Sequence, residues 1–492
     1  MIVTKENFAE AKRQFAEILP KASFIAFDEE MTGIFIHDDR DSDGTDAVEE
    51  RYARSKRAAD RYHIIQLGIA LFVPSDESGT GEYLAHTFNF FMYPNKDSSR
   101  DVVLSPATTH FLAEHKMDFN TWIKCGVSYV NDEQASEKRD KFERNWSSNT
   151  TTDTKVLRGP SDSKIKLTAQ SDIEFIDSTM ASIEEWMTND SSAGNTKLLK
   201  PANAFLRRVI YERVEENFPD LIVEKSSDNR NQLQVLRLSE DEKKARWERN
   251  RLEAKSKLEL DIGVFSIFEL LQKECTSRDV PVIVHNGMMD MLFLLTHFVA
   301  GPLDKYAQFC EQMQKTFPIV YDTKVLAERY QEDKILSSKL NGEGKPAIQN
   351  STWSSVLEYL VADLQKMHAE SNSERKGVAL HGENGETSGN YHSASYDAYM
   401  TGIAYYHFKI GDCCNGSACF GTRGCRNMIY LFRRRSSTLL KYFDLEKFTA
   451  STSSSNQTDD SNCDEKAMEV ETEGNTPVNG SVKRKADAVS IS

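Results

Sequence analysis

Apolar and polar residues alternate along this chain with two different periods, and these periods distinguish predicted helices from predicted strands. Residues 4–20 place apolar side chains near helical spacing, which predicts an amphipathic helix. Three apolar runs of strand type follow, at residues 24–27, 62–74 and 86–94. Residues 105–126 begin with a Ser-Pro helix-start signal and return to helical spacing. The first part of the chain therefore predicts a mixed sheet flanked by helices.

The second part of the chain alternates strands with helices. A helix at residues 264–272 precedes two strand-then-helix units, at residues 281–298 and 316–330. Two further helices are predicted at residues 354–367 and 391–408, with a polar loop between them. Strands in a run, followed by alternating strands and helices, predict an α/β fold with a mixed sheet. Binding sites in such folds lie at the carboxyl ends of the strands.

Polar and charged stretches interrupt these patterns. Residues 35–60 are predicted to form a solvent loop or a short helix, and residues 131–168, charged and then rich in Ser, Thr and Asn, a linker. Between about residues 170 and 255 a unit of different character interrupts the core. The predicted divisions are two core parts (1–168 and 259–412), an inserted small α/β domain (169–258), a segment of its own (413–448) and a disordered acidic, Ser-rich tail (449–492).

The composition limits the class of protein. A chain of 492 residues exceeds one ordinary core, so two domains with flexible segments are expected. The net charge of −15 argues against a surface coated uniformly for nucleic acid, although residues 449–482 hold seven acids and one lysine. Eight cysteines in so long a chain do not make a disulfide framework. Without a signal-peptide core or a run of about 20 apolar residues, we expect an intracellular protein with no membrane insertion.

Consecutive acids end the first predicted strand. Side chains alternate between the two faces of a strand, so Asp28 and Glu30 should share one face while Glu29 points to the other. Paired carboxylates can hold magnesium or manganese, and two such ions can clamp the reacting oxygens of a phosphodiester. One pair of acids is too few for that task, and a strand ending in a solvated acidic turn is the simpler interpretation of these residues alone.

Further acids follow the later strands. Asp290 lies in the helix after the strand PVIVH, and Asp322 closes the strand of FPIVYD. His392 and Asp397 are five residues apart, which on a helix separates them by about 140°. They would share a face only loosely unless His392 lies on the loop that leads into the helix.

Four short motifs occur in an order that resembles a known family. FDEEMTG, HNGMMD, YDTK and HSASYDAYMTG are together similar to the histidine-bearing subclass of the DEDD exonuclease superfamily, and most similar to its poly(A)-specific ribonuclease group of deadenylases. The resemblance covers roughly residues 1–410 and implies a ribonuclease-H-like core. It also implies Asp28, Glu30, Asp290 and Asp397 as the ligands of two Mg²⁺ or Mn²⁺ ions, and His392 as the general base.

The same resemblance implies a pocket for the terminal nucleotides. Its lining would comprise Met31, Ile34, Phe111 and Lys324. The family often has an aromatic residue where Met31 stands, so strict adenine preference is in doubt. Core packing is an equal alternative for Ile34 and Phe111. Asp322 is better interpreted as an acid that supports the ligands than as a ligand.

Two segments outside the core also resemble parts of the family. The helix FLRRVIYERV resembles that of a single-strand-binding domain with an Arg-x3-His motif, with Tyr211 in place of the histidine after Arg207. Its arginines could pair with phosphates, although a solvated helix is as good an interpretation. Residues 427–448 resemble the beginning of an RNA-recognition-type domain, so residues 413–448 are predicted to be its vestige. No tryptophan follows Trp353, which argues against cap binding.

These motifs predict a magnesium-dependent 3′ to 5′ exoribonuclease that trims single-stranded RNA and releases 5′-nucleotides. Poly(A) tails and precursors of Piwi-associated small RNAs are alternative substrates. A catalytically silent RNA-binding scaffold and a DNA exonuclease are the other functions considered. The resemblance leaves open a homodimer and an adaptor protein for recruitment. A basic cluster, Lys483, Arg484 and Lys485, is a weak signal for nuclear import, so both cytoplasm and nucleus are expected locations.

Overall fold

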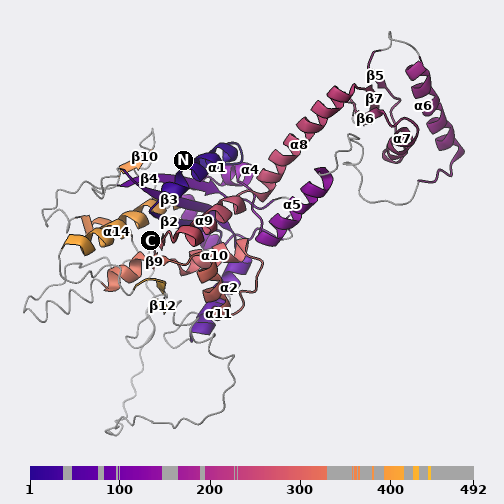
Figure 1. The fold of residues 1–492 in the computed structure, drawn as a ribbon. Coiled ribbons are helices and arrows are strands. Elements are labelled where there is room, and N and C mark those ends of the chain that lie inside the picture. The colour runs from indigo at the N-terminus through magenta and orange to yellow at the C-terminus, as the bar shows by residue number, and fades with distance from the viewer. Residues whose placement is uncertain are drawn as a thin grey trace, which may run out of the picture.

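A mixed β-sheet organises the main body of the protein, which we describe from a computed structural model (Figure 1). The structure describes residues 1–36, 47–75, 83–95, 98, 100–146, 165–188, 194–226, 228–229, 231–329, 357, 360–362, 364–365, 379–381, 393–414, 425–430 and 442–444. In this part of the chain the sheet has the order β1-β4-β3-β2-β8-β9-β11-β12, and β10 also pairs with β4. The expected α/β fold with a mixed sheet is confirmed.

Both strand directions occur in this sheet. Strands β2, β3 and β4 are antiparallel neighbours, although α2 lies between β2 and β3 in the chain, whereas β2, β8, β9 and β11 are parallel neighbours. The strands of the sheet are β1 (Ile2–Val3), β2 (Phe24–Met31), β3 (Ile64–Pro74), β4 (Tyr83–Phe91), β8 (Val282–Val284), β9 (Val320–Asp322), β10 (Ala379–His381), β11 (Met428–Tyr430) and β12 (Tyr442–Asp444).

Helices cover the two faces of the sheet with separate apolar cores. Alternate residues of β2 supply both, since Ile25 and Phe27 belong to one core and Phe24 and Ala26 to the other. The first core also receives α1 (Phe8–Ile18), α2 (Val48–Arg61), α9 (Phe265–Arg278), α10 (Met288–Phe298) and α11 (Tyr306–Thr316). The second receives α14 (Ala394–Cys414) and the helical residues 323–329. None of the described helices combines the length and apolar composition that a membrane span requires.

The helix expected at residues 105–126 is divided in two. Helix α3 (Pro106–Glu114) ends where Lys116 adopts a left-handed backbone, with φ of 63°. Helix α4 (Phe119–Cys125) then begins at Asp118, whose carboxylate accepts a hydrogen bond from the backbone N of Thr121 at 2.9 Å. A capping residue inside a helical pattern therefore ends one helix and begins the next.

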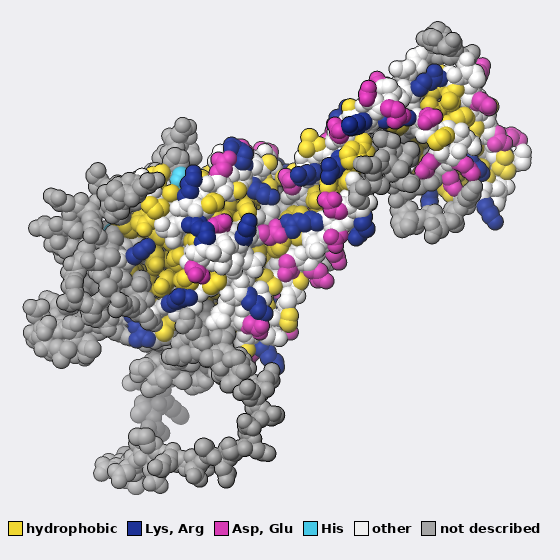
Figure 2. All heavy atoms as spheres, viewed as in Figure 1, with side chains coloured by type: hydrophobic (Ala, Val, Ile, Leu, Met, Phe, Trp, Pro, Cys, Tyr) yellow, Lys and Arg dark blue, Asp and Glu magenta, His cyan; other side chains and the backbone are white. Residues whose placement is uncertain are grey.

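A second, smaller unit stands away from the main body (Figure 1). It has a three-stranded antiparallel sheet, β5-β7-β6, and an apolar core of its own. Its elements are α6 (Gln170–Thr188), β5 (Thr196–Leu198), α7 (Ala204–Asn217), β6 (Leu221–Lys225) and β7 (Leu233–Arg237). Two long helices, α5 (Asp132–Trp146) and α8 (Glu240–Ile262), connect it to the main sheet. We call this helix pair the stalk, and Figure 2 shows basic, acidic and apolar side chains intermixed along it.

The prediction of a linker is wrong for its first part, residues 132–146. Residues 132–146 form helix α5, because this stretch lacks Gly and Pro and is rich in the helix formers Glu, Lys, Arg and Gln. The Arg139 guanidinium also donates to both carboxylate oxygens of Glu269 on α9, at 2.7 and 2.5 Å, which ties α5 to the main body. Residues 147–164 of the predicted linker lie outside the described residues.

Residues 413–448, predicted to be the vestige of an RNA-recognition-type domain, contribute two described strands to the main sheet. Strand β11 pairs in parallel with β9, and β12 pairs with β11, so both extend the main sheet. Asn427 fixes this junction, because its side chain accepts from the backbone N of Val320 at 2.8 Å and donates to the carbonyl of Pro318 at 3.1 Å. The predicted tail, residues 449–492, lies outside the described residues.

Candidate active site

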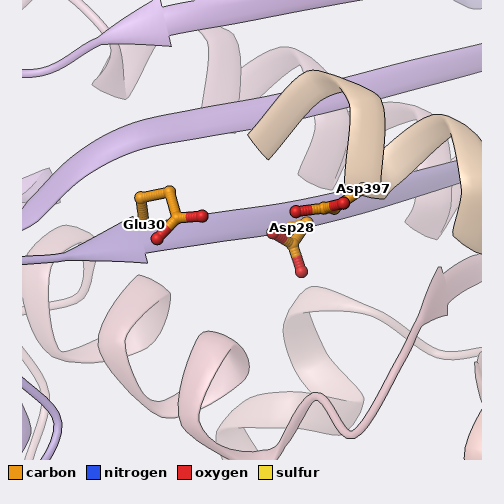
Figure 3. A group of neighbouring side chains, drawn as sticks. All are labelled: Asp28, Glu30 and Asp397. Atoms are coloured by element: carbon orange, nitrogen blue, oxygen red, sulfur yellow. The ribbon is translucent and has the colours of Figure 1, made fainter. Parts of the chain in front are cut away.

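Three carboxylates meet where β2 passes under the first turn of α14. Asp28 and Glu30 come from β2 and Asp397 from α14, and one oxygen of each lies within 4.8 Å of the other two (Figure 3). Asp28 and Glu30 are two residues apart on a strand, so the pleat places both on the face that α14 covers. This is the arrangement that the sequence pattern predicts for the first two acids.

Asp290 approaches the same strand from α10, in the first turn of that helix. Its Oδ1 accepts a hydrogen bond from the backbone N of Glu29 at 3.2 Å. Asp290 is also the largest electrostatic influence on Asp28 after burial, since it raises the pKa of that carboxyl more than Asp397, Glu30 and Glu29 do. The four acids predicted as metal ligands, separated by as many as 369 positions in the sequence, therefore converge on one patch.

Burial and mutual repulsion make this patch electrostatically costly. Burial raises the pKa of Glu30, and Asp397 and Asp290 raise it further. Burial raises the pKa of Asp290 to about 7. Among the described residues no cationic side chain offsets these effects at Asp28 or Glu30. Carboxylates clustered in this way fit a hard divalent cation, which prefers oxygen ligands.

Asp322, which ends β9, supports this patch without joining it. Its fully buried carboxylate accepts hydrogen bonds from the backbone N of Asn286 (2.9 Å), Gly287 (3.2 Å) and Lys324 (2.9 Å). Asn286 has a left-handed backbone, with φ of 55°, and belongs to the turn that leads from β8 into α10. Asp322 therefore fixes the turn that presents Asp290, in keeping with the supporting role expected from the sequence.

Replacing Asp322 by asparagine is expected to destabilise this turn. An amide presents one acceptor where the carboxylate presents two, so a buried backbone N–H loses its partner and the free energy of unfolding falls by about 2–3 kcal/mol. Urea denaturation measures the loss, and Asp304→Asn, at an exposed position, is the matched control that should change stability by less than about 0.5 kcal/mol. Equal stability of the two variants would contradict the role assigned to Asp322.

His392, the predicted general base, lies outside the described residues. Helix α14 begins at Ala394, with Ser393 just before it.

The predicted nucleotide-pocket residues differ in their surroundings. Met31 is buried and belongs to the first apolar core, and Ile34 packs against the same core. Phe111 on α3 is 41% exposed, and the centroid of its ring lies 4.2 Å from that of the His115 ring. The Nζ of Lys324 donates to Oδ1 of Asn286 at 3.2 Å, in the turn before α10. Of these four, Phe111 presents the largest exposed fraction of its side chain for contact with a base.

Three residues that the sequence analysis did not identify position α14. Gly68 pairs with Asp28 in the β2-β3 ladder, and a Cβ at Gly68 would lie only 2.0 Å from the carbonyl carbon of Ala394. Gln66 Oε1 accepts from the backbone N of Ala394 at 3.3 Å, and Asn89 Nδ2 donates to Gln66 Oε1 and to Ser393 Oγ. These contacts seat the first turn of α14 directly on β3. A glycine inside a mostly apolar strand was the available signal.

Glu29 is buried on β2 between the two predicted ligands and is not part of the cluster. Neither of its carboxylate oxygens has a hydrogen-bond partner among the described residues. Burial raises its pKa well above the usual carboxyl value, and Asp290 raises it further. A buried acid without a partner is destabilising when ionised.

In the inserted unit, the arginine and tyrosine of the predicted phosphate-binding helix make contacts within the protein. Arg207 donates to the carbonyl of Ala202 at 2.5 Å and to Asn231 Oδ1 at 3.0 Å. Tyr211 packs against the core of the inserted unit, and burial raises its pKa. These contacts favour a structural role for both residues.

Comparison with known proteins was made against family models, curated sequences and solved structures. A family model described as CAF1 family ribonuclease matches residues 3–405. The poly(A)-specific ribonuclease PARN of Xenopus laevis is 24% identical over 82% of this chain and 62% of that protein. The pre-piRNA 3′-exonuclease trimmer of Bombyx mori is also 24% identical, over 82% of this chain and 70% of that protein. The chain thus matches less than two thirds of the length of the Xenopus relative.

Among solved structures, S. pombe Pop2p in its Mg²⁺ and Mn²⁺ bound form is 13% identical, with a TM-score of 0.36 over 83% of this chain and 91% of that one. A likeness of this size has no bearing on the site.

Proposed function

Because this chain belongs to the CAF1 family of ribonucleases, we propose that it is a 3′ to 5′ exoribonuclease that hydrolyses single-stranded RNA with bound Mg²⁺ or Mn²⁺. One observation carries the proposal. Asp28, Glu30, Asp290 and Asp397 gather at one patch although burial and mutual repulsion oppose it. Buried carboxylates that repel one another are costly, and a bound cation would offset that cost.

The protein's own residues divide the work in this proposal. The four carboxylates hold two metal ions, and Asp322 and Gly68 keep two of these acids, Asp290 and Asp397, in place. When bound, such ions activate water and stabilise the leaving 3′ oxygen. His392 accepts the proton of the attacking water, as the motif resemblance implies. Phe111, exposed on α3, contacts a base near the 3′ end.

The test uses purified protein and a single-stranded RNA labelled at its 5′ end. With Mg²⁺ we expect a ladder that shortens from the 3′ end and releases 5′-nucleotides, no reaction with EDTA, and no shortening when the 3′ hydroxyl is blocked. A matched deoxyribose strand that is shortened equally well would overturn RNA specificity. Tight RNA binding without any hydrolysis would instead support a catalytically silent scaffold.

Two substrate classes are compatible with this chemistry. Poly(A) is suggested by the name of the Xenopus relative, and precursors of Piwi-associated RNAs by that of the Bombyx relative. Both relatives are 24% identical over 82% of this chain, so we keep precursors of Piwi-associated RNAs as the alternative substrate. Equal-length RNAs ending in adenines or in mixed sequence, compared by kcat/KM, separate these substrates.

Metal affinity is expected to fall as the pH falls below about 7. The pKa of Asp290 is raised to about 7 and those of Asp28 and Glu30 lie well above their usual range, so these carboxyl groups hold protons that a cation must displace. A carboxyl group that titrates between about pH 8 and pH 6 must lose its proton before it can bind Mn²⁺. Each such group should lower the apparent Mn²⁺ affinity roughly tenfold over this range. Calorimetric titration in two buffers measures affinity and proton release together. Affinity that is constant over this range would contradict the shifts.

A further inference from the structure

The stalk carries a groove that the proposed catalytic function does not use. It lies between α5 and α8 and has a volume of about 370 Å³. Aromatic, basic and apolar side chains line it, among them Phe142, Trp247, Arg251, Leu252 and Lys255. Leu252 is 65% exposed at this groove.

Two aromatic rings line this groove, one from each helix, and a buried third ring lies beside both. Trp146, which is buried, packs edge-on against Trp247 with ring centroids 5.7 Å apart, and Phe142 lies 6.2 Å from Trp146. Trp146 therefore joins α5 to α8, while Phe142 and Trp247 remain only half-buried. Half-buried rings held by a buried neighbour present rigid apolar surface to a ligand.

Cationic side chains follow the aromatic ring along α8. Trp247, Arg251 and Lys255 are spaced by four residues and form one stripe of the helix. The Arg251 guanidinium lies over the Trp247 ring, 5.5 Å from its centroid. Arg251 and Lys255 are both exposed, and neither forms an ion pair with another described residue. Figure 2 shows basic side chains, together with acidic ones, along the stalk.

This combination matches the chemistry of single-stranded nucleic acid. Bases of any sequence stack on aromatic side chains, and basic side chains beside them pair with the phosphates. Glu143 and Glu248 also line the groove, so it is not a uniformly basic surface. We therefore expect the aromatic rings to contribute more to binding than the charges do.

The stalk begins at the same end of the main sheet as the acids. Glu30 pairs with Gln66 on β3, and Gln66 pairs with Phe91 on β4. The next residue of β4, Met92, bridges to Val127, just before α5. The two stalk ends are joined by a bridge between Tyr129 and Gly263. The base of the stalk therefore lies at the same end of the sheet as Glu30, and the groove lies further out along the two helices.

We propose that the groove between α5 and α8 binds a single-stranded RNA segment upstream of the 3′ end that the acids process. The inference rests on the proposed function, because it takes the RNA to be anchored at the four carboxylates. It adds a binding site with aromatic and phosphate contacts, and it implies that long substrates bind more tightly than short ones.

The test compares two double variants of α8. Arg251→Glu with Lys255→Glu changes the groove, whereas Arg249→Glu with Lys257→Glu makes the same charge change on the opposite side of the helix. Fluorescence anisotropy in EDTA measures the Kd of a long and a short RNA, so that binding is measured whether or not the protein cuts RNA. Trp247→Ala tests the stacking contribution, with circular dichroism to confirm that the stalk is still helical.

We expect Trp247→Ala to weaken binding of the long RNA by roughly tenfold or more, the order of one lost stacking contact, and the groove variant to weaken it by a smaller factor, about fivefold. Binding of the short RNA and of the control variant should stay within about twofold of the unmodified protein. The proposal is overturned by equal losses for both RNAs, by equal losses for the groove and control variants, or by no loss. It is also overturned if sedimentation shows that the groove variant alters self-association, because the groove would then be an interface between copies.

Discussion

Replacing Asp28 by asparagine is expected to abolish RNA hydrolysis and to raise the thermal midpoint of the metal-free protein at about pH 8. Asparagine keeps the size of the side chain and removes its charge. Loss of a charged ligand from the patch should lower kcat by roughly 10³-fold, the order found when one preorganised electrostatic group is removed from an active site. It should weaken Mn²⁺ binding in parallel.

The rise in stability follows from the direction of the pKa shift. Burial and the neighbouring acids raise the pKa of Asp28 in the folded protein well above the value of about 4 in the unfolded chain. Above about pH 4 the folded state therefore holds more protons than the unfolded state, so stability falls as the pH rises toward the folded pKa. Asparagine does not titrate, and the variant avoids this loss. Below about pH 4 both states are protonated, and the difference between variant and parent should vanish.

The neighbouring acid provides a matched control. Glu29 is also buried with a raised pKa, but it is not part of the carboxylate cluster. Glu29→Gln should therefore raise the thermal midpoint of the metal-free protein in the same way while hydrolysis and Mn²⁺ affinity stay within a few-fold of the parent. Calorimetric scans in EDTA and assays with Mg²⁺ measure the two effects. If Asp28→Asn retained activity, or if Glu29→Gln lost it, the assignment of the two faces of β2 would be wrong.

The acids of β2 could be predicted from sequence because they depend only on local geometry. The two-residue period of a strand places Asp28 and Glu30 on one face wherever the strand lies. Their convergence with Asp290 and Asp397 is a tertiary property, and spacing alone did not give it. The order of four motifs, each resembling the same family, supplied that step. His392 was predicted on the same basis, and it lies outside the described residues.

Local pattern is not sufficient where an element depends on a partner that is distant in the sequence. Residues 132–146 have too few apolar positions to predict a buried helix, yet they pair with α8 and are tied to α9 through Arg139. Strand β11 has only three residues, and its place beside β9 depends on the side-chain hydrogen bonds of Asn427. Neither the partner helix nor the partner strand is adjacent in sequence, so no local period reports them.

Replacing Gly68 by alanine is expected to separate Asp397 from Asp28 and to destabilise the fold. The added Cβ would lie 2.1 Å from the carbonyl oxygen of Ala394 and 2.2 Å from the backbone N of Ser395. These are backbone atoms, which cannot rotate away as a flexible side chain could, so the first turn of α14 must move off β3. Such overpacking costs about 3 kcal/mol, and displacement of a reacting group by about 1 Å lowers activity roughly 10²-fold.

Gly301 provides the control for this substitution, because a Cβ there would meet only Val299 Cγ1, at an ordinary 3.7 Å. Gly301→Ala should leave stability and hydrolysis within about twofold of the parent. Activity and Mn²⁺ affinity of Gly68→Ala are measured well below its thermal midpoint, where circular dichroism shows it folded, so that displacement of α14 is separated from unfolding. A folded Gly68→Ala protein with full activity and unchanged Mn²⁺ affinity would show that the contact between β3 and α14 does not set the distance between Asp28 and Asp397. The expected loss of activity and of Mn²⁺ affinity would show that Gly68 lets Asp397, on a helix, share a cation with Asp28 and Glu30, on a strand.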